Sequence, residues 1–218
     1  MKIRGAIFDM DGTLADSMYI WLTVASEFLK SRGKTPAPDI DKRMYDKSVF
    51  DTVDVFRSEY CIEGSDEEIM RSVYSFVEKR YEDNVGLKDG VIEFLEYLKD
   101  KGIPMCIATA TDRYISEPAT IRLGIRPYMK EIFTVKEIGK GKGHPDIYLT
   151  AAELLGTDPE ETVVFEDALY AVKTAKAAGF KVVAIHEDGY EPDWEEAKAT
   201  ADIAVNVPRE LIGMFEEE

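Results

Sequence analysis

The sequence is poor in the residues that form cross-links and zinc sites. It has two cysteines, Cys61 and Cys106, and two histidines, His144 and His186, among 218 residues. Two thiols so far apart in the chain do not make a disulfide framework, and we expect both to be reduced. Zinc sites gather three or four cysteine, histidine or carboxylate ligands, so two distant histidines also argue against one.

Long apolar runs are missing as well. No uninterrupted hydrophobic stretch approaches the roughly 20 residues that a transmembrane helix needs. The apolar run at residues 3–8 meets the acidic Asp9 too soon to form a signal peptide. The sequence therefore predicts a cytoplasmic protein that does not span a membrane.

Basic residues are scarce relative to acidic ones. The chain has 27 Lys and Arg against 43 Asp and Glu, which gives a formal net charge of -16. Nucleic acids and anionic membranes are bound by basic patches, so the composition argues against both as partners. An acidic protein that acts on an anionic substrate needs a local cationic site, built from a metal ion and a few placed lysines.

What the sequence does contain is a regular alternation of short apolar runs with helical patterns. Strands are expected at residues 3–8, 103–108, 132–135, 162–165, 181–185 and 203–207, and helices at 91–99, 147–155 and 168–178. Strands that are apolar throughout and alternate with helices are typical of a parallel sheet covered on both faces. The predicted fold is α/β, a doubly wound Rossmann-like core with a mostly parallel sheet.

One interval interrupts this alternation. About 95 residues separate the first two strands, whereas a crossover needs about a dozen. The interval contains helical patterns at 18–30, 46–60 and 67–81, with Ser65 and Glu68 spaced as a capping box.

We therefore predict a smaller all-helical cap domain at residues 17–85, inserted after the first strand. The catalytic core then consists of residues 1–16 and 86–218. Ligands of open parallel sheets bind at the carboxyl ends of the strands. The cap is expected to act there as a lid that excludes water and selects substrates.

Two acidic residues follow the first predicted strand, in the segment Asp9-Met10-Asp11-Gly12-Thr13. In extended geometry Asp9 and Asp11 point the same way, with alpha carbons roughly 6–7 Å apart. Carboxylates this close repel each other unless a cation lies between them or one holds a proton. An ordinary polar turn is the alternative interpretation, but the position at a strand end favours a functional site.

Polar residues follow other predicted strands too. Thr109 and Ala110 end the second strand, where a hydroxyl and backbone N–H groups can hold a phosphoryl oxygen. Lys142 lies between two glycines in a loop before a helix. Glu166 and Asp167 follow the strand at 162–165, and paired carboxylates there suit a hard cation such as Mg²⁺. Together these groups supply what phosphoryl transfer requires: metal ligands, a cation and a nucleophile.

This arrangement resembles the haloacid dehalogenase superfamily, in its branch of small-molecule phosphatases and beta-phosphoglucomutase-like enzymes with a helical cap. The resemblance covers nearly the whole chain and is most specific in D-M-D-G-T-L-A-D-S at residues 9–17. It implies that Asp9 is the nucleophile that forms an aspartyl-phosphate, and that Asp11 is the general acid and later the base. It also implies that Thr109, Ala110 and Lys142 bind the phosphoryl group, with Lys142 balancing its charge.

The same resemblance implies a Mg²⁺ cofactor. Its ligands would be the Asp9 carboxylate, the backbone carbonyl of Asp11, and Asp167 together with Glu166. Asp16 and Ser17 would form the hinge of the cap.

Three features depart from the family pattern. The third motif commonly reads K-P-x-P-D, but residues 142–146 read K-G-H-P-D, so one proline is missing. The fourth commonly reads E-D-S with a later glycine, and Ala168 and Ala171 stand at those two positions. The G-x-S-R-type cap signature of the mutases has no clear counterpart at residues 44–51. These departures weaken a mutase assignment more than phosphatase chemistry.

The predicted function is a Mg²⁺-dependent phosphatase that hydrolyses a small phosphate monoester, such as a sugar or polyol phosphate. The alternatives are a phosphomutase, and a catalytically weak module that binds a phosphorylated ligand. Arg43, Lys47 and Arg113 are the residues that could grip a sugar phosphate in a mutase, although solvated surface charges explain each of them. The expected partner is a small phosphorylated metabolite, and the expected state is a monomer or weak homodimer.

Overall fold

The computed structural model describes residues 1–44, 49–188 and 191–215. The chain divides into two compact units. The core unit consists of Met1–Asp16 with Gly86–Glu218, and the helical unit consists of Ser17–Val85.

The core unit is built on a parallel sheet whose strand order is β5-β4-β1-β6-β7-β8. All of its strand pairs run parallel. The strands are β1 (Gly5–Phe8), β4 (Met105–Thr109), β5 (Met129–Thr134), β6 (Thr162–Glu166), β7 (Lys181–Ile185) and β8 (Ile203–Val205). The central strands β1, β4 and β6 are buried along their whole length, as expected for a sheet covered on both faces.

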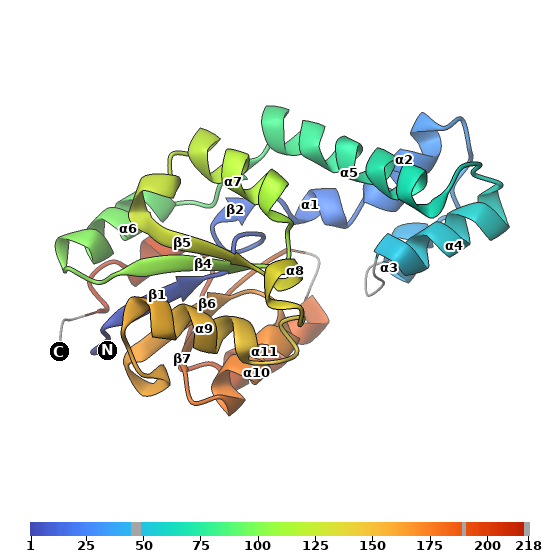
Figure 1. Ribbon diagram of the computed structural model, residues 1–218. Helices are drawn as coiled ribbons and strands as arrows, with labels where there is room; N and C mark the ends of the chain where they lie inside the picture. Colours follow the sequence, from blue (N-terminus) through green and yellow to red (C-terminus); the bar gives the residue numbers. More distant parts are fainter. Residues whose placement is uncertain (45–48, 189–190, 216–218) are drawn as a thin grey trace. The chain divides into compact units, whose positions relative to one another are not determined.

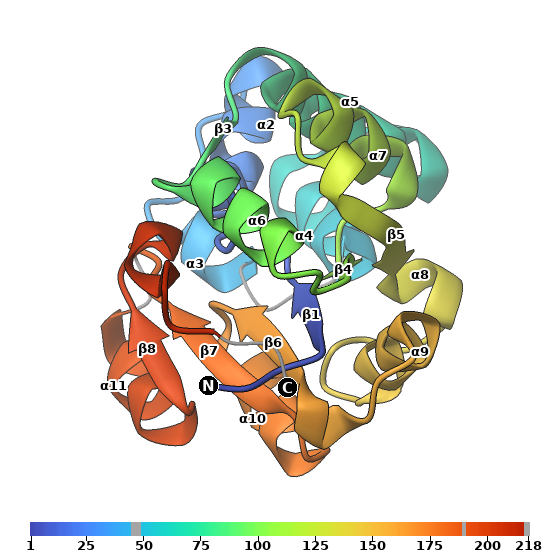
Figure 2. The ribbon, with the colours of Figure 1, turned by 90° about the vertical axis from the view of Figure 1, so that its left-hand side faces the viewer.

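Helices cover both faces of this sheet (Figure 1). On one face lie α6 (Val91–Asp100) and α7 (Arg113–Arg122), and on the other lie α9 (Asp146–Leu155), α10 (Leu169–Ala177) and α11 (Glu191–Thr200). Figure 2 shows β8 and α11 at one edge of the core unit, and β5 with α8 (Val135–Ile138) at the other. The chain passes from β1 to β4 in one direction and from β6 to β7 in the other, so the sheet is doubly wound, as predicted.

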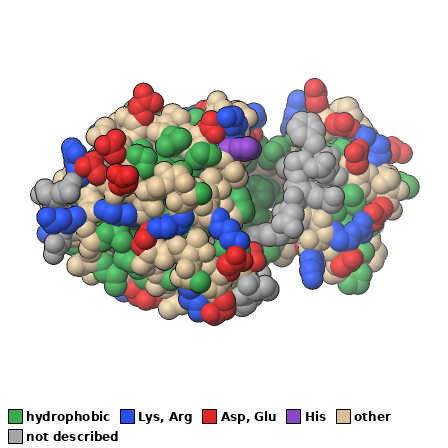
Figure 3. All heavy atoms as spheres, turned by 90° about the horizontal axis from the view of Figure 1, so that it is seen from below, with side chains coloured by type: hydrophobic (Ala, Val, Ile, Leu, Met, Phe, Trp, Pro, Cys, Tyr) green, Lys and Arg blue, Asp and Glu red, His purple; other side chains and the backbone are tan. Residues whose placement is uncertain are grey.

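The surface of the core unit carries both acidic and basic side chains. In the space-filling view of Figure 3, basic and acidic side chains are interspersed over the visible face of the core unit. Among the described residues, the helices are too short or too polar to span a bilayer.

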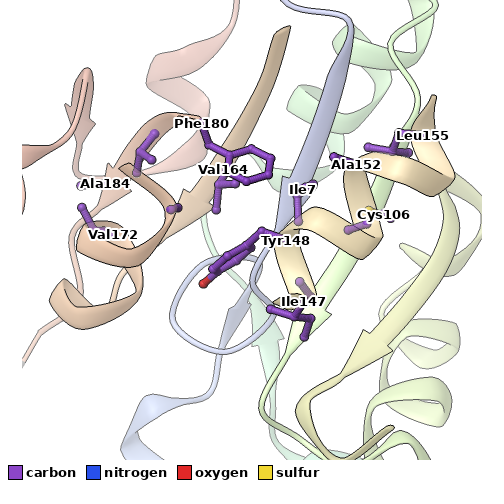
Figure 4. Packing of buried hydrophobic residues seen from close by; sticks show 14 of the residues in the cluster. Ile7, Cys106, Ile147, Tyr148, Ala152, Leu155, Val164, Val172, Phe180 and Ala184 are labelled. Atoms are coloured by element: carbon purple, nitrogen blue, oxygen red, sulfur yellow. The ribbon is translucent and has the colours of Figure 1, made fainter. Parts of the chain in front are cut away.

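Two apolar layers hold the strands in place. Under α9 and α10, Ile7, Tyr148 and Val164 belong to one buried cluster with Phe180 (Figure 4). On the α6 face, the rings of Phe8 and Phe165 stack with centroids 4.4 Å apart, and Phe94 and Phe215 pack against the edges of this pair. Burying a side chain of this size contributes about 1.5–3 kcal/mol. The packing on both faces fixes the strand ends where the polar residues lie.

The helical unit contains five helices and no strand within its described residues. They are α1 (Met18–Trp21), α2 (Val24–Ser31), α3 (Ile40–Met44), α4 (Val49–Tyr60) and α5 (Asp66–Asp83). Its core includes Phe28 and Phe56, whose rings stack with centroids 5.0 Å apart. The capping box of Ser65 and Glu68 at the start of α5 is confirmed. The role of this unit as a cap stays a prediction.

Two helix predictions differ from the structure. The single helix expected at 18–30 is broken into α1 and α2 at Leu22 and Thr23. Thr23 leaves the helical region, with φ -131°, and its hydroxyl donates to the carbonyl of Tyr19 at 2.6 Å, so the side chain competes with the helix backbone. The helix expected at 46–60 is seen from Val49, since residues 46–48 lie outside the described part of the chain.

Some elements had no counterpart in the prediction. Helix α7 has Pro118 in its interior, and the proline masked its helical pattern. Strands β2 (Ala15–Asp16) and β3 (Gly86–Leu87) pair antiparallel but are too short to show a sequence period. Strand β5 was expected to begin at residue 132, and it begins three residues earlier, at Met129.

Candidate active site

Asp9 lies at the centre of the core sheet, directly after β1. Strand β1 lies between β4 and β6, and Phe8 is paired with Phe165. The backbone N–H of Asp9 donates to the carbonyl of Phe165 at 2.9 Å. This register places Asp9 beside Glu166, the last residue of β6. The connections that follow β1 and β6 lead in opposite directions, which makes this edge the switch point where ligands of such sheets bind.

Three predicted acidic residues and the predicted lysine meet here. Carboxylate oxygens of Asp9, Glu166 and Asp167 lie within 4.8 Å of one another. The Lys142 ammonium donates to Asp9 Oδ1, and to Glu166 Oε1 at 2.6 Å. Only 4% of Lys142 is exposed, so the loop between α8 and α9 delivers a buried cation to the carboxylates.

The electrostatics of this cluster are dominated by burial. Burial raises the pKa of Asp9 well above its usual value, Lys142 opposes the shift, and the neighbouring carboxylates of Glu166 and Asp167 add to it. Burial and then the charge of Glu166 raise the pKa of Asp167 to about 7. Burial disfavours the Lys142 ammonium, but Asp9 and Glu166 outweigh it and hold the lysine pKa above its ordinary value. Because three carboxylates are grouped with a single ammonium, a further cation would reduce the repulsion among them.

The carboxylate of Glu166 is half satisfied. Its Oε1 accepts hydrogen bonds from Lys142 and from the Tyr148 hydroxyl, the latter at 2.8 Å. Its Oε2 is buried and has no hydrogen-bond partner among the described residues. A buried acceptor without a donor costs about 1–3 kcal/mol. An orphaned oxygen among clustered carboxylates is what a hard cation such as Mg²⁺ binds, so the residues fit this metal.

Asp11 is not a member of that three-carboxylate cluster, although its charge acts on Asp9, and its side chain is oriented by a threonine. Asp11 Oδ2 accepts a hydrogen bond from the Thr111 hydroxyl at 2.6 Å. The backbone N–H of Thr111 donates to Thr109 Oγ1 at 3.0 Å. Thr109 is fully buried at the end of β4, and Ala110, between the two threonines, is exposed. The hydrogen bond from Thr111 to Asp11 therefore joins the segment after β4 to the segment after β1.

Three contacting residues were missed at the sequence level. Thr111 orients Asp11, Tyr148 donates to Glu166, and the Thr13 hydroxyl donates to Asp167 Oδ1 at 3.4 Å. Thr13 lies in the acidic segment that follows the first strand, and this position could have indicated that it contacts the site. Tyr148 fits the apolar period of α9 and is therefore indistinguishable from a core residue in the sequence.

The residues considered for gripping a sugar phosphate are engaged elsewhere or not described. Arg113 forms ion pairs with three glutamates of the core unit, Glu117, Glu131 and Glu137. Arg43 pairs with Glu59 within the helical unit. Lys47 lies outside the described residues.

Comparison with known proteins gives a consistent result. The sequence profile of the haloacid dehalogenase-like hydrolases matches residues 6–185. The phosphorylated carbohydrates phosphatase of Thermotoga maritima is 27% identical over 99% of both chains. Hexitol phosphatase A of Escherichia coli is 28% identical over 90% of this chain and 89% of the relative.

A solved structure supports the same assignment. The crystal structure of a candidate beta-phosphoglucomutase from Thermotoga maritima superimposes with a TM-score of 0.82 at 27% identity, over 98% of both chains. The match in sequence extends from β1 to β7, so it includes every strand end that carries a candidate site residue. The chain belongs to the haloacid dehalogenase-like hydrolase family.

Proposed function

We propose that the chain is a phosphatase that hydrolyses a small phosphate monoester, with a phosphorylated sugar or polyol as the substrate class. The observation that carries this proposal is the buried contact of Asp9 with Lys142 beside Glu166 and Asp167. The proposed nucleophile, a cation and the proposed metal ligands thereby lie together at the carboxyl-terminal edge of the sheet. Two relatives support the substrate class, because they are named as phosphatases of phosphorylated carbohydrates and of hexitols.

Asp9 is the proposed nucleophile. One of its carboxylate oxygens attacks phosphorus, which forms an aspartyl-phosphate and breaks the bond between phosphorus and the ester oxygen. The Lys142 ammonium, already in contact with Asp9 Oδ1, reduces the repulsion between this carboxylate and the approaching phosphoryl oxygens. The Thr109 hydroxyl and the backbone at Ala110 are proposed to bind those oxygens at the adjacent strand end.

Asp11 is the proposed acid and base. It donates a proton to the departing alkoxide, and it then removes a proton from the water that hydrolyses the aspartyl-phosphate. Its side chain is already oriented by the Thr111 hydroxyl at 2.6 Å.

Mg²⁺ is the proposed cofactor. Asp9, Glu166 and Asp167 would hold it, together with the Asp11 carbonyl that the family resemblance implies. When bound, the ion would supply positive charge that stabilises the anionic phosphoryl group.

Residues 17–85 are proposed to serve as the cap that selects the substrate, with Asp16 and Ser17 at its hinge. The partner is then a small phosphorylated metabolite in the cytoplasm. A nucleic acid is disfavoured by the formal net charge of -16. The alternative of a phosphomutase has support from the name of one structural relative. Hydrolysis is favoured over the mutase reaction because Arg43 and Arg113, the residues considered for binding a sugar phosphate, instead form ion pairs with Glu59 and Glu137.

The test is phosphate release from a panel of sugar, polyol and glycolate phosphates in Mg²⁺, for wild type and Asp9→Asn. The matched control is Asp100→Asn, which makes the same change at an exposed position at the end of α6. We expect Asp9→Asn to lose nearly all activity and Asp100→Asn to keep it. An Asp9→Asn variant as active as wild type refutes the nucleophile, and full turnover in EDTA refutes the metal role. Conversion of a sugar 1-phosphate to its 6-phosphate without phosphate release would favour the mutase.

A further inference from the structure

A second buried lysine, separate from Lys142, contacts the loop that follows Asp11. Lys88 directly follows β3, and its ammonium donates to the carbonyl of Gly12 at 2.8 Å and to that of His186 at 2.6 Å. Its third partner is the carboxylate of Glu187. Only 10% of the Lys88 side chain and 8% of the Glu187 side chain are exposed. An ammonium has three donors, and all three are used here, which fixes its position.

The loop at residues 10–15 is closed on itself. The N–H groups of Leu14 and Ala15 both donate to the carbonyl of Met10, at 3.0 and 2.7 Å. The N–H of Gly12 donates to the carbonyl of Ala15 at 2.9 Å. Gly12 has φ +76°, in the left-handed region that favours glycine, so the chain reverses sharply just after Asp11.

Lys88 holds this loop at two points. Its backbone N–H donates to the carbonyl of Leu14 at 3.0 Å, and its ammonium donates to the carbonyl of Gly12. The Thr111 hydroxyl donates to the side chain of Asp11. The backbone and the carboxylate of the Asp11 segment are thus held separately, the first by Lys88 and the second by Thr111.

We propose that Lys88 is a positioning residue for Asp11, holding the loop at residues 10–15 in the geometry that proton transfer requires. This inference rests on the proposed function, in which Asp11 protonates the leaving alkoxide. Loss of the ammonium leaves two carbonyls without their donor, and the loop relaxes. A displacement of about 1 Å at a catalytic group can cost about 100-fold in rate.

The competing explanation is that Lys88 only neutralises the buried carboxylate of Glu187. Lys88→Met alone leaves that charge unpaired and can disturb the fold, so the test also uses the double variant Lys88→Met with Glu187→Met. The double variant removes both charges but still removes the grip on Gly12. The matched control is Lys176→Met, which breaks the pair with Asp202 at 2.8 Å elsewhere in the core unit.

The readout separates proton transfer from general damage. kcat/KM is measured at saturating Mg²⁺, so that weaker binding of the ion by the Asp11 carbonyl does not lower both values. The substrates are p-nitrophenyl phosphate, whose leaving group departs without a proton, and the best alkyl phosphate from the wild-type panel. We expect Lys88→Met and the double variant to lose about 10- to 100-fold on the alkyl ester and less than about threefold on the aryl ester. Lys176→Met is expected to change neither value beyond about twofold.

Each result supports or refutes the positioning role of Lys88. Equal losses on both esters, or recovery of the alkyl activity in the double variant, would overturn the positioning role while leaving the phosphatase proposal intact. A wild type that releases phosphate from no ester overturns the proposed function and this inference with it. If Lys88→Met fails to fold, the double variant, which has no unpaired buried charge, carries the comparison.

Discussion

Replacing Lys142 with methionine removes the ammonium that lies between the carboxylates of Asp9 and Glu166. The lysine is 4% exposed, and both carboxylates are buried. Removing one partner of a buried ion pair costs about 3–5 kcal/mol, because the remaining charge is left uncompensated. For a chain of this size, each kcal/mol lowers Tm by about 2–4 °C. We therefore expect Lys142→Met to melt about 6–20 °C below wild type in EDTA.

The assay is thermal unfolding followed by circular dichroism or calorimetry in EDTA. Lys140→Met is the matched control, since it makes the same change two residues away in the same unit. Lys140 is 53% exposed and pairs with Asp146 at 2.7 Å, and an exposed pair is worth about 0–1 kcal/mol. A Lys142→Met protein that melts as high as the Lys140→Met control would refute the claim that Lys142 is a buried counter-charge.

The loss in Lys142→Met is expected to grow with pH. Burial already raises the pKa of Asp9 in the folded state, and Lys142 is the charge that lowers it. Without the lysine, the pKa of Asp9 in the folded state rises further above its unfolded value, so the folded state keeps this proton to higher pH. Stability then falls as pH rises, since the folded state binds more protons. In EDTA, the gap in Tm between variant and wild type is expected to widen from pH 5 to pH 8, and a constant gap would contradict this cause.

Two further predictions concern other parts of the core and the free thiols. A Cβ at Gly90 would lie 2.4 Å from the Cβ of Arg209, whereas one at Gly156 would meet nothing within 4 Å; both glycines have positive φ, +77° and +75°. Gly90→Ala is therefore expected to lower the free energy of unfolding by about 1–3 kcal/mol more than Gly156→Ala, and equal losses in denaturant titrations would refute the close contact. Cys61 is exposed, while Cys106 is buried and burial raises its thiol pKa. Ellman's reagent is expected to titrate Cys61 in the native protein and Cys106 only after unfolding, and rapid native reaction at both would contradict the burial of Cys106.

The sequence was informative where the signal is local. Buried strands such as β4 and β6 are short apolar runs, and polar residues follow where each run reaches the edge of the sheet, so Thr109 and Glu166 could be located without a structure. The sequence did not reveal which groups contact one another across the fold. The ammonium of Lys88 and the hydroxyl of Thr111 act on a loop far away in the chain, and no local pattern connects them to it.

Two other differences have physical causes that the sequence carries but that a periodic pattern hides. The apolar spacing of residues 18–30 continues across Thr23, although its hydroxyl bonds to the backbone and breaks the helix there. No helix was predicted at residues 113–122, yet helix α7 forms there with Pro118 in its interior. At Thr23 a local hydrogen bond overrides the apolar period, whereas in α7 the helix forms despite the local preference of proline against it.

The short pairing of β2 with β3 has a consequence for the evolution of the molecule. Ala15 lies opposite Leu87 and Asp16 opposite Gly86, so the chain leaves the core unit and returns to it on hydrogen-bonded neighbours. A segment whose two ends are already joined can be lengthened, shortened or exchanged at little cost in loop-closure entropy. Residues 17–85, the proposed cap, can therefore change in length and sequence while the strands that present the carboxylates stay unchanged.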